Sequence, residues 1–328
     1  MRPPVRLLLD NELAVVLCPR EQLAQAYVAF YCGVGSRHET PAQNGLSHVL
    51  EHMLFRGTAS FPEATALNAA AEEFGGFLEG ATYRDHMLFA TACHPSAVGD
   101  AVAILGELVQ TPRYRGMEVE RAILREELLE TLDADGRMVD LDNTAHRAAY
   151  GEHGLGLPIE GTLVNLERID VAALEEHRRR YVVGANSVVS IAGPIDVGEV
   201  VMQVKRAFGR LDAGRAPMVE TPPPARHEPV LRYVRDASSQ IDIRLSFDAV
   251  SISDPEYPAL VMLARILADG LASRMHAELV DRRGLAYALH AGLTTYGDCG
   301  RFDFEVSVAP DRAAAAVAAI LDFASAAG

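Results

Sequence analysis

His48, Glu51 and His52 combine residue types and a spacing that suit metal-assisted chemistry on water. The surrounding run, residues 45–58, has no proline, repeats apolar residues at helical intervals and reaches a terminating glycine, which predicts a helix. Residues four apart share one helix face, so both imidazoles can reach one divalent metal. Glu51 can then contact a water on that metal without being a ligand. The alternative is a helix with two surface histidines beside a glutamate.

The pentapeptide at 48–52 is an H-x-x-E-H motif, the inverted zincin arrangement. With its flanks, the run from Gly45 to Thr58 resembles the zinc-site helix of the pitrilysin/insulinase family, which includes the mitochondrial processing peptidases. The resemblance implies a zinc metalloendopeptidase with Zn2+ on His48 and His52 and with Glu51 as general base. It also implies an α+β fold of two homologous LuxS/MPP-like metallohydrolase domains, whose antiparallel-rich sheets have helices packed against them.

A catalytic zinc takes three protein ligands and keeps one position open for water. In the family, the third ligand is a glutamate on a later helix, within the pattern E-R-x-x-x-x-x-E. Residues 120–127 match this pattern without a gap. The match implies Glu127 as the ligand and Glu120 as a second-shell group that hydrogen-bonds a zinc-bound histidine. Glu126 is a rival ligand because it lies near the apolar stripe of the same helix. A solvated acidic face is the alternative for these residues.

Residues 75–82 resemble the family segment G-G-x-x-N-A-x-T, a strand edge on which extended peptides pair by β-augmentation. The implied substrate strand comprises Phe77, Leu78, Glu79 and Gly80. Glu79 and Gly80 replace the family's Asn and Ala, so the resemblance supports the backbone role more than side-chain contacts. The alternative is an ordinary glycine turn from a helix into a strand.

In the second domain of the family, a tyrosine and an arginine seven residues before it reach the substrate carbonyl at the metal. The tyrosine matches Tyr287 here, whereas the arginine position is Val280. Arg282 and Arg283 lie nearby but on other helical faces. The alternative for Tyr287 is a half-buried strand tyrosine.

The elements that must position these residues are short β-branched or aromatic runs and longer amphipathic stretches. Strands are predicted at residues 5–10, 13–18, 25–32, 77–83, 86–93, 187–192 and 241–247. Besides the metal helix, helices are predicted at 62–74, 95–110, 139–150, 171–181, 197–208 and 259–268. The run 117–132 is apolar nearly all round, which predicts a long buried helix.

The second part of the chain repeats the first at an offset of about 214 residues, which predicts a duplicated domain. The predicted division is a zinc-carrying domain at 1–215, a Pro-rich linker at 216–229 and a second domain at 230–328. The second copy stops after a helix at 311–323, so it is expected to be incomplete.

The offset also tests whether the second copy can bind metal. It places Met262, Arg265 and Ile266 opposite the three motif residues of the first copy. None of these side chains is a usual zinc ligand. The sequence therefore predicts a single metal site, in the first copy.

Composition restricts the partners and the compartment. A formal net charge of −15 argues against nucleic acid or an anionic membrane as the main partner. The four cysteines are scattered without a C-x-x-C pair, so neither a disulfide framework nor a cysteine zinc site is indicated. The first residues lack a signal-peptide apolar core, and no apolar run is long enough to span a bilayer. We expect a cytoplasmic protein, or a periplasmic one if a leader was removed.

The sequence thus predicts a zinc-dependent endopeptidase that hydrolyses extended or unfolded peptides. One alternative is a non-catalytic structural subunit of a heteromeric complex, against which the intact motif counts. The other is a zinc-dependent peptide-binding chaperone or maturation factor with slow turnover, which the valine at position 280 keeps open. Family members close their chamber with a second pair of domains, so the resemblance implies a homodimer or a heterodimer with a related subunit.

Overall fold

The computed structural model describes residues 3–224, 228–235 and 237–326. The chain forms two compact units, of which the first comprises residues 1–130 and 157–220 and the second residues 131–156 and 221–328. Residues 212–224 form neither helix nor strand, and residues 225–227 of the predicted linker lie outside the described residues. The two units are defined by which residues pack together, whereas the predicted boundaries at residues 215 and 229 were placed from the sequence. Those boundaries therefore stay a prediction.

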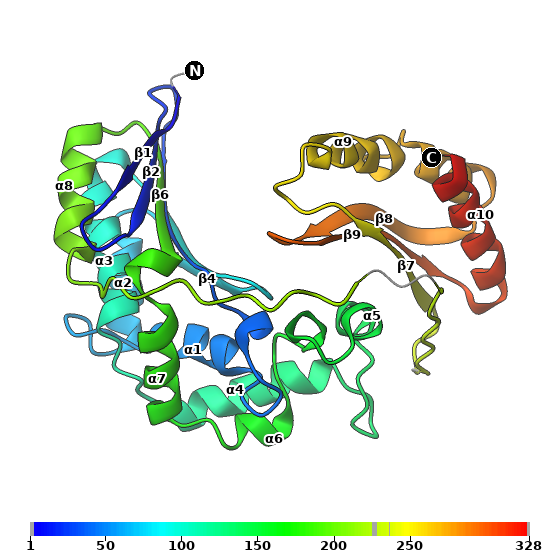
Figure 1. Ribbon diagram of the computed structural model, residues 1–328, viewed down its shortest axis with the longest axis horizontal. Helices are drawn as coiled ribbons and strands as arrows, with labels where there is room; N and C mark the ends of the chain where they lie inside the picture. The colour runs from blue at the N-terminus through cyan, green and yellow to red at the C-terminus, as the bar shows by residue number, and fades with distance from the viewer. Residues whose placement is uncertain (1–2, 225–227, 236, 327–328) are drawn as a thin grey trace. The chain divides into compact units, whose positions relative to one another are not determined.

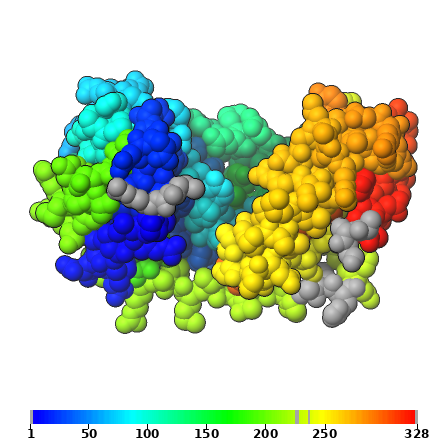
Figure 2. Space-filling model, turned by 90° about the horizontal axis from the view of Figure 1, so that it is seen from above, coloured from blue at the N-terminus to red at the C-terminus, as the bar shows by residue number. Residues whose placement is uncertain are grey.

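The first unit is built on a six-stranded sheet in the order β1-β2-β6-β3-β5-β4 (Figure 1). Its strands are β1 Val5–Leu8, β2 Ala14–Pro19, β3 Ala26–Cys32, β4 Leu78–Thr82, β5 Met87–Cys93 and β6 Ser187–Gly193. The pair β2–β6 is parallel and every other pair is antiparallel. β4 and β1 are the two edge strands. β1 lies mostly exposed at the surface, within the dark blue region of Figure 2.

Helices pack around this sheet and close its core. They are α1 Leu46–Leu54, α2 Ala64–Glu72, α3 Val98–Gln110, α4 Met117–Glu130, α6 Leu163–Leu166, α7 Val171–Tyr181 and α8 Val197–Phe208. α3 packs on β3 and β5 and against α8. The Phe30 and Phe208 rings stack at 5.4 Å, which joins α8 to the sheet. No helix in the described part of the chain combines the length and apolar character needed to cross a membrane.

The prediction that the helix at 117–132 is buried nearly all round is wrong. In α4 the buried residues are Glu120, Leu124 and Leu128, a single stripe with a four-residue repeat. Val119 and Ile123 are 56% and 44% exposed. Glutamates and arginines occupy much of the remaining surface, so α4 is a surface helix with one inward face.

The second unit contains a three-stranded antiparallel sheet in the order β7-β9-β8. Its elements are α5 Leu141–Tyr150, β7 Ile241–Ala249, α9 Tyr257–Ala268, a π-helix at His276–Arg282, β8 Ala286–Thr295, β9 Gly300–Val308 and α10 Ala313–Ala326. This order and these antiparallel pairings repeat those of β3-β5-β4. The predicted α+β fold with two homologous domains is therefore confirmed.

The segment 131–156 joins the second unit through polar contacts. His146 Nε2 on α5 lies 3.0 Å from the Tyr296 hydroxyl. Arg244 on β7 pairs with Asp142 at 2.7 Å and with Glu305 at 2.8 Å. Because the Arg244 side chain is only 10% exposed, both carboxylates offset the cost of burying its charge.

The start of α1 is held by a buried carboxylate from the preceding loop. Glu39 accepts hydrogen bonds from the backbone N–H groups of Gly45 and Ser47, both at 2.7 Å, and from the Asn44 side chain at 3.1 Å. Burial raises the pKa of Glu39, and these donors act in the opposite direction. The carboxylate thus satisfies N–H groups that a helix start leaves without an intrahelical partner.

We expect Glu39→Gln to lower the free energy of unfolding by about 2 kcal/mol. The NH2 group of the new amide is a donor and cannot accept the hydrogen bonds that the Gly45 and Ser47 N–H groups give to the carboxylate. Urea unfolding followed by circular dichroism measures this change. Glu130→Gln, an exposed change at the end of α4, is the control and should stay within about 0.5 kcal/mol of the parent. Equal stability of the two variants would contradict this role of Glu39.

Candidate metal centre

α1 presents its two histidines on one face because its other face is locked into the core. Val49, Leu50, Met53 and Leu54 are at most 2% exposed, which fixes the rotation of the helix. The histidine side chains remain partly accessible, at 13% for His48 and 19% for His52. Their ring centroids lie 4.8 Å apart in an edge-to-face arrangement. The helical spacing of the motif therefore brings both rings to one place, as the sequence predicts.

α4 packs against α1 and brings a carboxylate to the same place. Glu127 Oε2 lies 3.7 Å from His48 Nε2 and 3.6 Å from His52 Nε2. Ligand atoms of these three side chains all lie within 4.8 Å of one another. Among the described residues, no other group of three or more histidine, cysteine, aspartate or glutamate side chains has its ligand atoms this close together.

The rival residue on the same helix lies elsewhere. Glu126 is exposed, and no ion pair joins it to either histidine within the described residues. Glu127 is offset from it by about 100° around a helix of 3.6 residues per turn. The geometry therefore favours Glu127 as the third donor, through a carboxylate oxygen.

Glu120 orients one of the two imidazoles. Its Oε1 lies 2.9 Å from His52 Nδ1, and its Oε2 lies 3.4 Å from an Arg56 guanidinium nitrogen. The carboxylate side chain is 9% exposed, and both oxygens have partners. A hydrogen bond from Nδ1–H to Glu120 leaves Nε2 of His52, on the side of Glu127, able to donate a lone pair, which is how metal-binding histidines are usually held.

The donor set suits zinc. Two imidazole nitrogens and one carboxylate oxygen form a known set of three protein ligands for a catalytic zinc. Burial and the neighbouring His52 lower the pKa of His48 to about 3, so its imidazole is neutral and able to donate a lone pair near neutral pH. Tetrahedral coordination at about 2.1 Å separates ligand atoms by roughly 3.4 Å. The two distances to Glu127 need only a small contraction to reach that value.

Glu51 lies beside the cluster, on the side of strand β4. Its Oε2 accepts a hydrogen bond from the Thr82 hydroxyl at 3.3 Å. Burial raises the pKa of Glu51, and the charges of Glu127 and Glu120 add to this effect, while His52 and the Thr82 hydrogen bond oppose it. A carboxylate with a raised pKa is better matched to accepting and returning a proton near neutral pH.

Gly80 on β4 leaves the space that Glu51 occupies. A Cβ at this position would collide with Glu51 Oε1 and would lie 2.5 Å from Cε2 of the Phe55 ring. The glycine backbone therefore lies directly against the carboxylate. The backbone of β4 at Gly80 thus limits the positions that the Glu51 carboxylate can take.

We expect Gly80→Ala to push the Glu51 carboxylate away from Thr82, because the carboxylate is the more mobile of the two obstructing groups. A crystal structure of the variant should show the Thr82–Glu51 distance beyond about 3.5 Å, the limit of a hydrogen bond. Metal content by mass spectrometry should stay unchanged, since the three candidate ligands are not displaced. Gly297→Ala, where a Cβ meets no atom within 4 Å, is the control. A hydrogen bond retained in Gly80→Ala would refute the steric argument.

The remaining predicted residues are not members of this cluster. Phe77 precedes β4 and is 66% exposed, and Leu78 and Glu79 begin that strand. Tyr287 belongs to β8 of the second unit and is 83% exposed, so it is not the half-buried strand tyrosine of the alternative interpretation. Arg282 pairs with Glu278 at 3.0 Å, and Val280 lies within the π-helix. The roles of these residues stay predictions.

Sequence reasoning did not assign three supporting contacts. Thr82 hydrogen-bonds Glu51, Arg56 pairs with Glu120, and the Ser47 hydroxyl lies 3.0 Å from His177 Nε2. Thr82 could have been found from the sequence, because it is the last residue of the 75–82 segment that resembles the family pattern. The other two contacts join segments whose spacing carries no motif.

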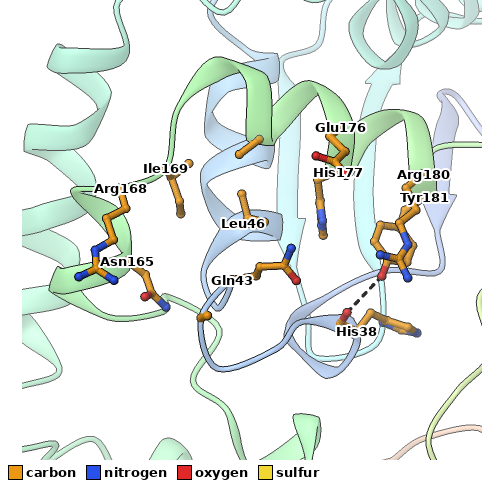
Figure 3. A pocket seen from close by; sticks show the side chains of 12 residues that line it. His38, Gln43, Leu46, Asn165, Arg168, Ile169, Glu176, His177, Arg180 and Tyr181 are labelled. Atoms are coloured by element: carbon orange, nitrogen blue, oxygen red, sulfur yellow. Dashed lines mark hydrogen bonds between the residues drawn. The ribbon is translucent and has the colours of Figure 1, made fainter.

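A separate cavity of about 130 Å³ lies between the start of α1 and α7 (Figure 3). His177, Tyr181, Leu46 and Asn165 are among the side chains that line it. None of the candidate metal ligands lines this cavity. The cavity is therefore distinct from the candidate metal centre.

Two family models match successive parts of the chain. Residues 15–163 match the model described as insulinase (peptidase family M16), and residues 168–326 match the peptidase M16 inactive domain. The cluster of His48, His52 and Glu127 lies entirely within the first match. Two family models therefore account for most of the chain.

Individual relatives agree with these matches. An uncharacterized zinc protease of Mycobacterium leprae is 30% identical over 313 residues, which cover 94% of this chain and 69% of the relative. The mitochondrial-processing peptidase subunit beta of Blastocladiella emersonii is 30% identical over 303 residues, 89% of this chain and 64% of the relative. The crystal structure of a peptidase M16 inactive domain from Pseudomonas fluorescens shares the fold, with a TM-score of 0.84 at 18% identity, over 94% of this chain and 75% of that one. The chain belongs to peptidase family M16, the insulinase family.

Proposed function

We propose that this chain is a zinc-dependent endopeptidase that hydrolyses extended or unfolded peptides. The observation that carries the proposal is the convergence of His48, His52 and Glu127, whose ligand atoms lie within 4.8 Å of one another. Glu51 is held next to them by Thr82. Relatives named as zinc proteases support the same reaction class.

In this proposal His48, His52 and Glu127 hold the zinc, and Glu120 keeps His52 in the required tautomer. When bound, zinc polarises a peptide carbonyl and increases the acidity of water. Glu51 accepts the proton of the attacking water at its carboxylate and later delivers it to the leaving amine. The Thr82 hydroxyl orients that carboxylate during both transfers.

The substrate binds along the edge of β4 in this proposal. β4 is the last strand of its sheet, and Gly80 lies directly against Glu51. A peptide added to this edge gains backbone hydrogen bonds that do not depend on its sequence. Tyr287 is proposed to contact the substrate carbonyl, as the family resemblance implies.

A non-catalytic or weakly catalytic peptide-binding subunit is the second candidate. Two observations favour it, namely the match of residues 168–326 to an inactive domain and the valine at position 280. The developing oxyanion then lacks one donor from this chain, and such a donor is worth roughly a hundred- to a thousand-fold in rate. A turnover assay on an unstructured peptide separates the two candidates.

We further propose that the chain works as a homodimer or with a related subunit. The relative from Blastocladiella emersonii is named as a subunit, which supports assembly into a larger complex. A related subunit with its own arginine and tyrosine would supply the hydrogen-bond donor that this chain does not have at position 280. A cytoplasmic location remains part of the proposal.

Removal of single ligands should abolish stoichiometric zinc. We expect His48→Ala, His52→Ala and Glu127→Ala to lose bound zinc in mass spectrometry of dialysed protein, because two remaining ligands hold the ion too weakly. Glu126→Ala is the matched control and should keep it. If Glu127→Ala kept full zinc while Glu126→Ala lost it, the assignment on α4 would be wrong by one residue.

Replacement of the general base should separate metal binding from turnover. We expect Glu51→Gln to retain zinc and to lose peptide hydrolysis by on the order of a hundred- to ten-thousand-fold, because an amide cannot accept the proton. Initial rates on an unstructured fluorogenic peptide measure this, with Glu130→Gln as control. Activity within a few-fold of the parent would remove Glu51 from the mechanism.

A further inference from the structure

We propose that Glu79 makes the peptide site selective for a basic side chain, at the substrate residue that pairs opposite Glu79 on the outer edge of β4. This inference rests on the proposed function and deepens it, because it names the substrate class. Four features of the first unit support it: the free strand edge, the two faces of that strand, the contact with Tyr27 and the charge around Glu79.

The outer edge of β4 is not paired with another strand within the described residues. On its inner side β4 pairs with β5, so that Glu79 lies opposite Ala90. On its outer side no strand of the described residues pairs with it. An extended peptide added here would continue the sheet, with its side chains alternating between the two faces.

The two faces of β4 have different neighbours. Gly80 and Thr82 face Glu51, as the steric contact and the hydrogen bond show. Glu79 and Ala81 alternate with them and therefore lie on the opposite face. A substrate residue that pairs with Glu79 would project on this opposite face, where the Glu79 carboxylate is the nearest charge on the strand.

Tyr27 holds the Glu79 carboxylate in place. Its hydroxyl donates to Glu79 Oε2 at 3.1 Å, across the intervening strand β5. The register explains the reach, because Tyr27 pairs with Ala92 and Glu79 with Ala90, two small residues over which the phenol ring can pass. Burial and the charge of Glu79 raise the pKa of Tyr27 to about 12, so the hydroxyl remains a neutral donor.

The charge of Glu79 is not neutralised within the protein. Glu79 is exposed, and no lysine, arginine or histidine of the described residues forms an ion pair with it. Across the chain, the 45 acidic residues outnumber the 30 lysines and arginines, so the protein as a whole does not compensate this negative charge. Opposite charges directly across an antiparallel strand pair are favourable and like charges are unfavourable. An arginine or lysine in the substrate is therefore favoured at this position, and an aspartate or glutamate is disfavoured.

The test uses a neutral reference peptide in which one arginine is moved through every position around the cleaved bond. At one position, we expect arginine to raise kcat/KM about two- to five-fold over alanine, and glutamate to lower it. Glu79→Gln should bring both ratios close to one, and Glu79→Lys should reverse them. Glu199→Gln, an exposed glutamate at the start of α8, is the matched control and should leave the ratios unchanged. The preference should also weaken as salt is raised.

Tyr27→Phe distinguishes positioning from charge. The variant keeps the Glu79 charge and loses the hydroxyl that holds it, so the arginine preference should shrink without changing sign. A preference that is equal in the parent, Glu79→Gln and Glu79→Lys proteins would overturn the proposal. So would a parent protein that cleaves the whole panel without any preference.

A binding measurement keeps this test independent of catalysis. In the Glu51→Gln protein, fluorescence anisotropy should give a tighter Kd for the arginine peptide than for its alanine counterpart, and Glu79→Lys in the same background should reverse that order. If no protein cleaves any peptide but the binding preference is present, the endopeptidase proposal fails and the role of Glu79 stands. Binding without any charge preference refutes the role of Glu79 alone.

Discussion

The packing of α4 against α1 is the contact on which the candidate metal centre depends. Two donors come from α1 and the third from α4, so neither helix forms the cluster alone. Glu120 joins the two helices through His52 and Arg56, in a nearly buried position. A buried carboxylate is costly unless its oxygens are paired, and here both are. The carboxylate that contacts an imidazole thus also links α4 to α1 and to Arg56, just beyond the end of α1.

The rest of the first unit supports α1 from several sides. Apolar residues fix its rotation, Glu39 satisfies the N–H groups at its start, and β4 lies against Glu51. The second unit repeats the strand order of β3-β5-β4, and the predicted offset of about 214 residues places Met262, Arg265 and Ile266 opposite the motif residues. Met262 and Ile266 are more than half exposed on α9. The same strand order therefore occurs with and without the H-x-x-E-H motif, so the fold does not depend on the motif.

Much of this arrangement was predictable because it depends on local periodicity. The bounds of α7 and α8 agree with the predicted helices, and the pairing of His48 with His52 follows directly from helical geometry. The burial of α4 was predicted wrongly. Its sequence contains many apolar residues, but only one stripe of the helix faces inward. The role of Arg56 depends on α4, which meets it only after folding, and the role of Glu39 depends on a loop conformation that helical periodicity does not encode. The grouping of residues 131–156 with the second unit likewise leaves no trace in periodicity.

The division of the chain into units has a mechanical consequence for the metal centre. α4 ends at Glu130, and the next residue already belongs to the second unit. Glu127 therefore lies within one helical turn of the covalent junction, while α5, a few residues beyond it, is tied to β7 by the Asp142–Arg244 ion pair. A force that displaces the second unit is applied to the chain next to a candidate metal ligand. Of the three candidate ligands, Glu127 is therefore the one that lies nearest along the chain to a junction between the units.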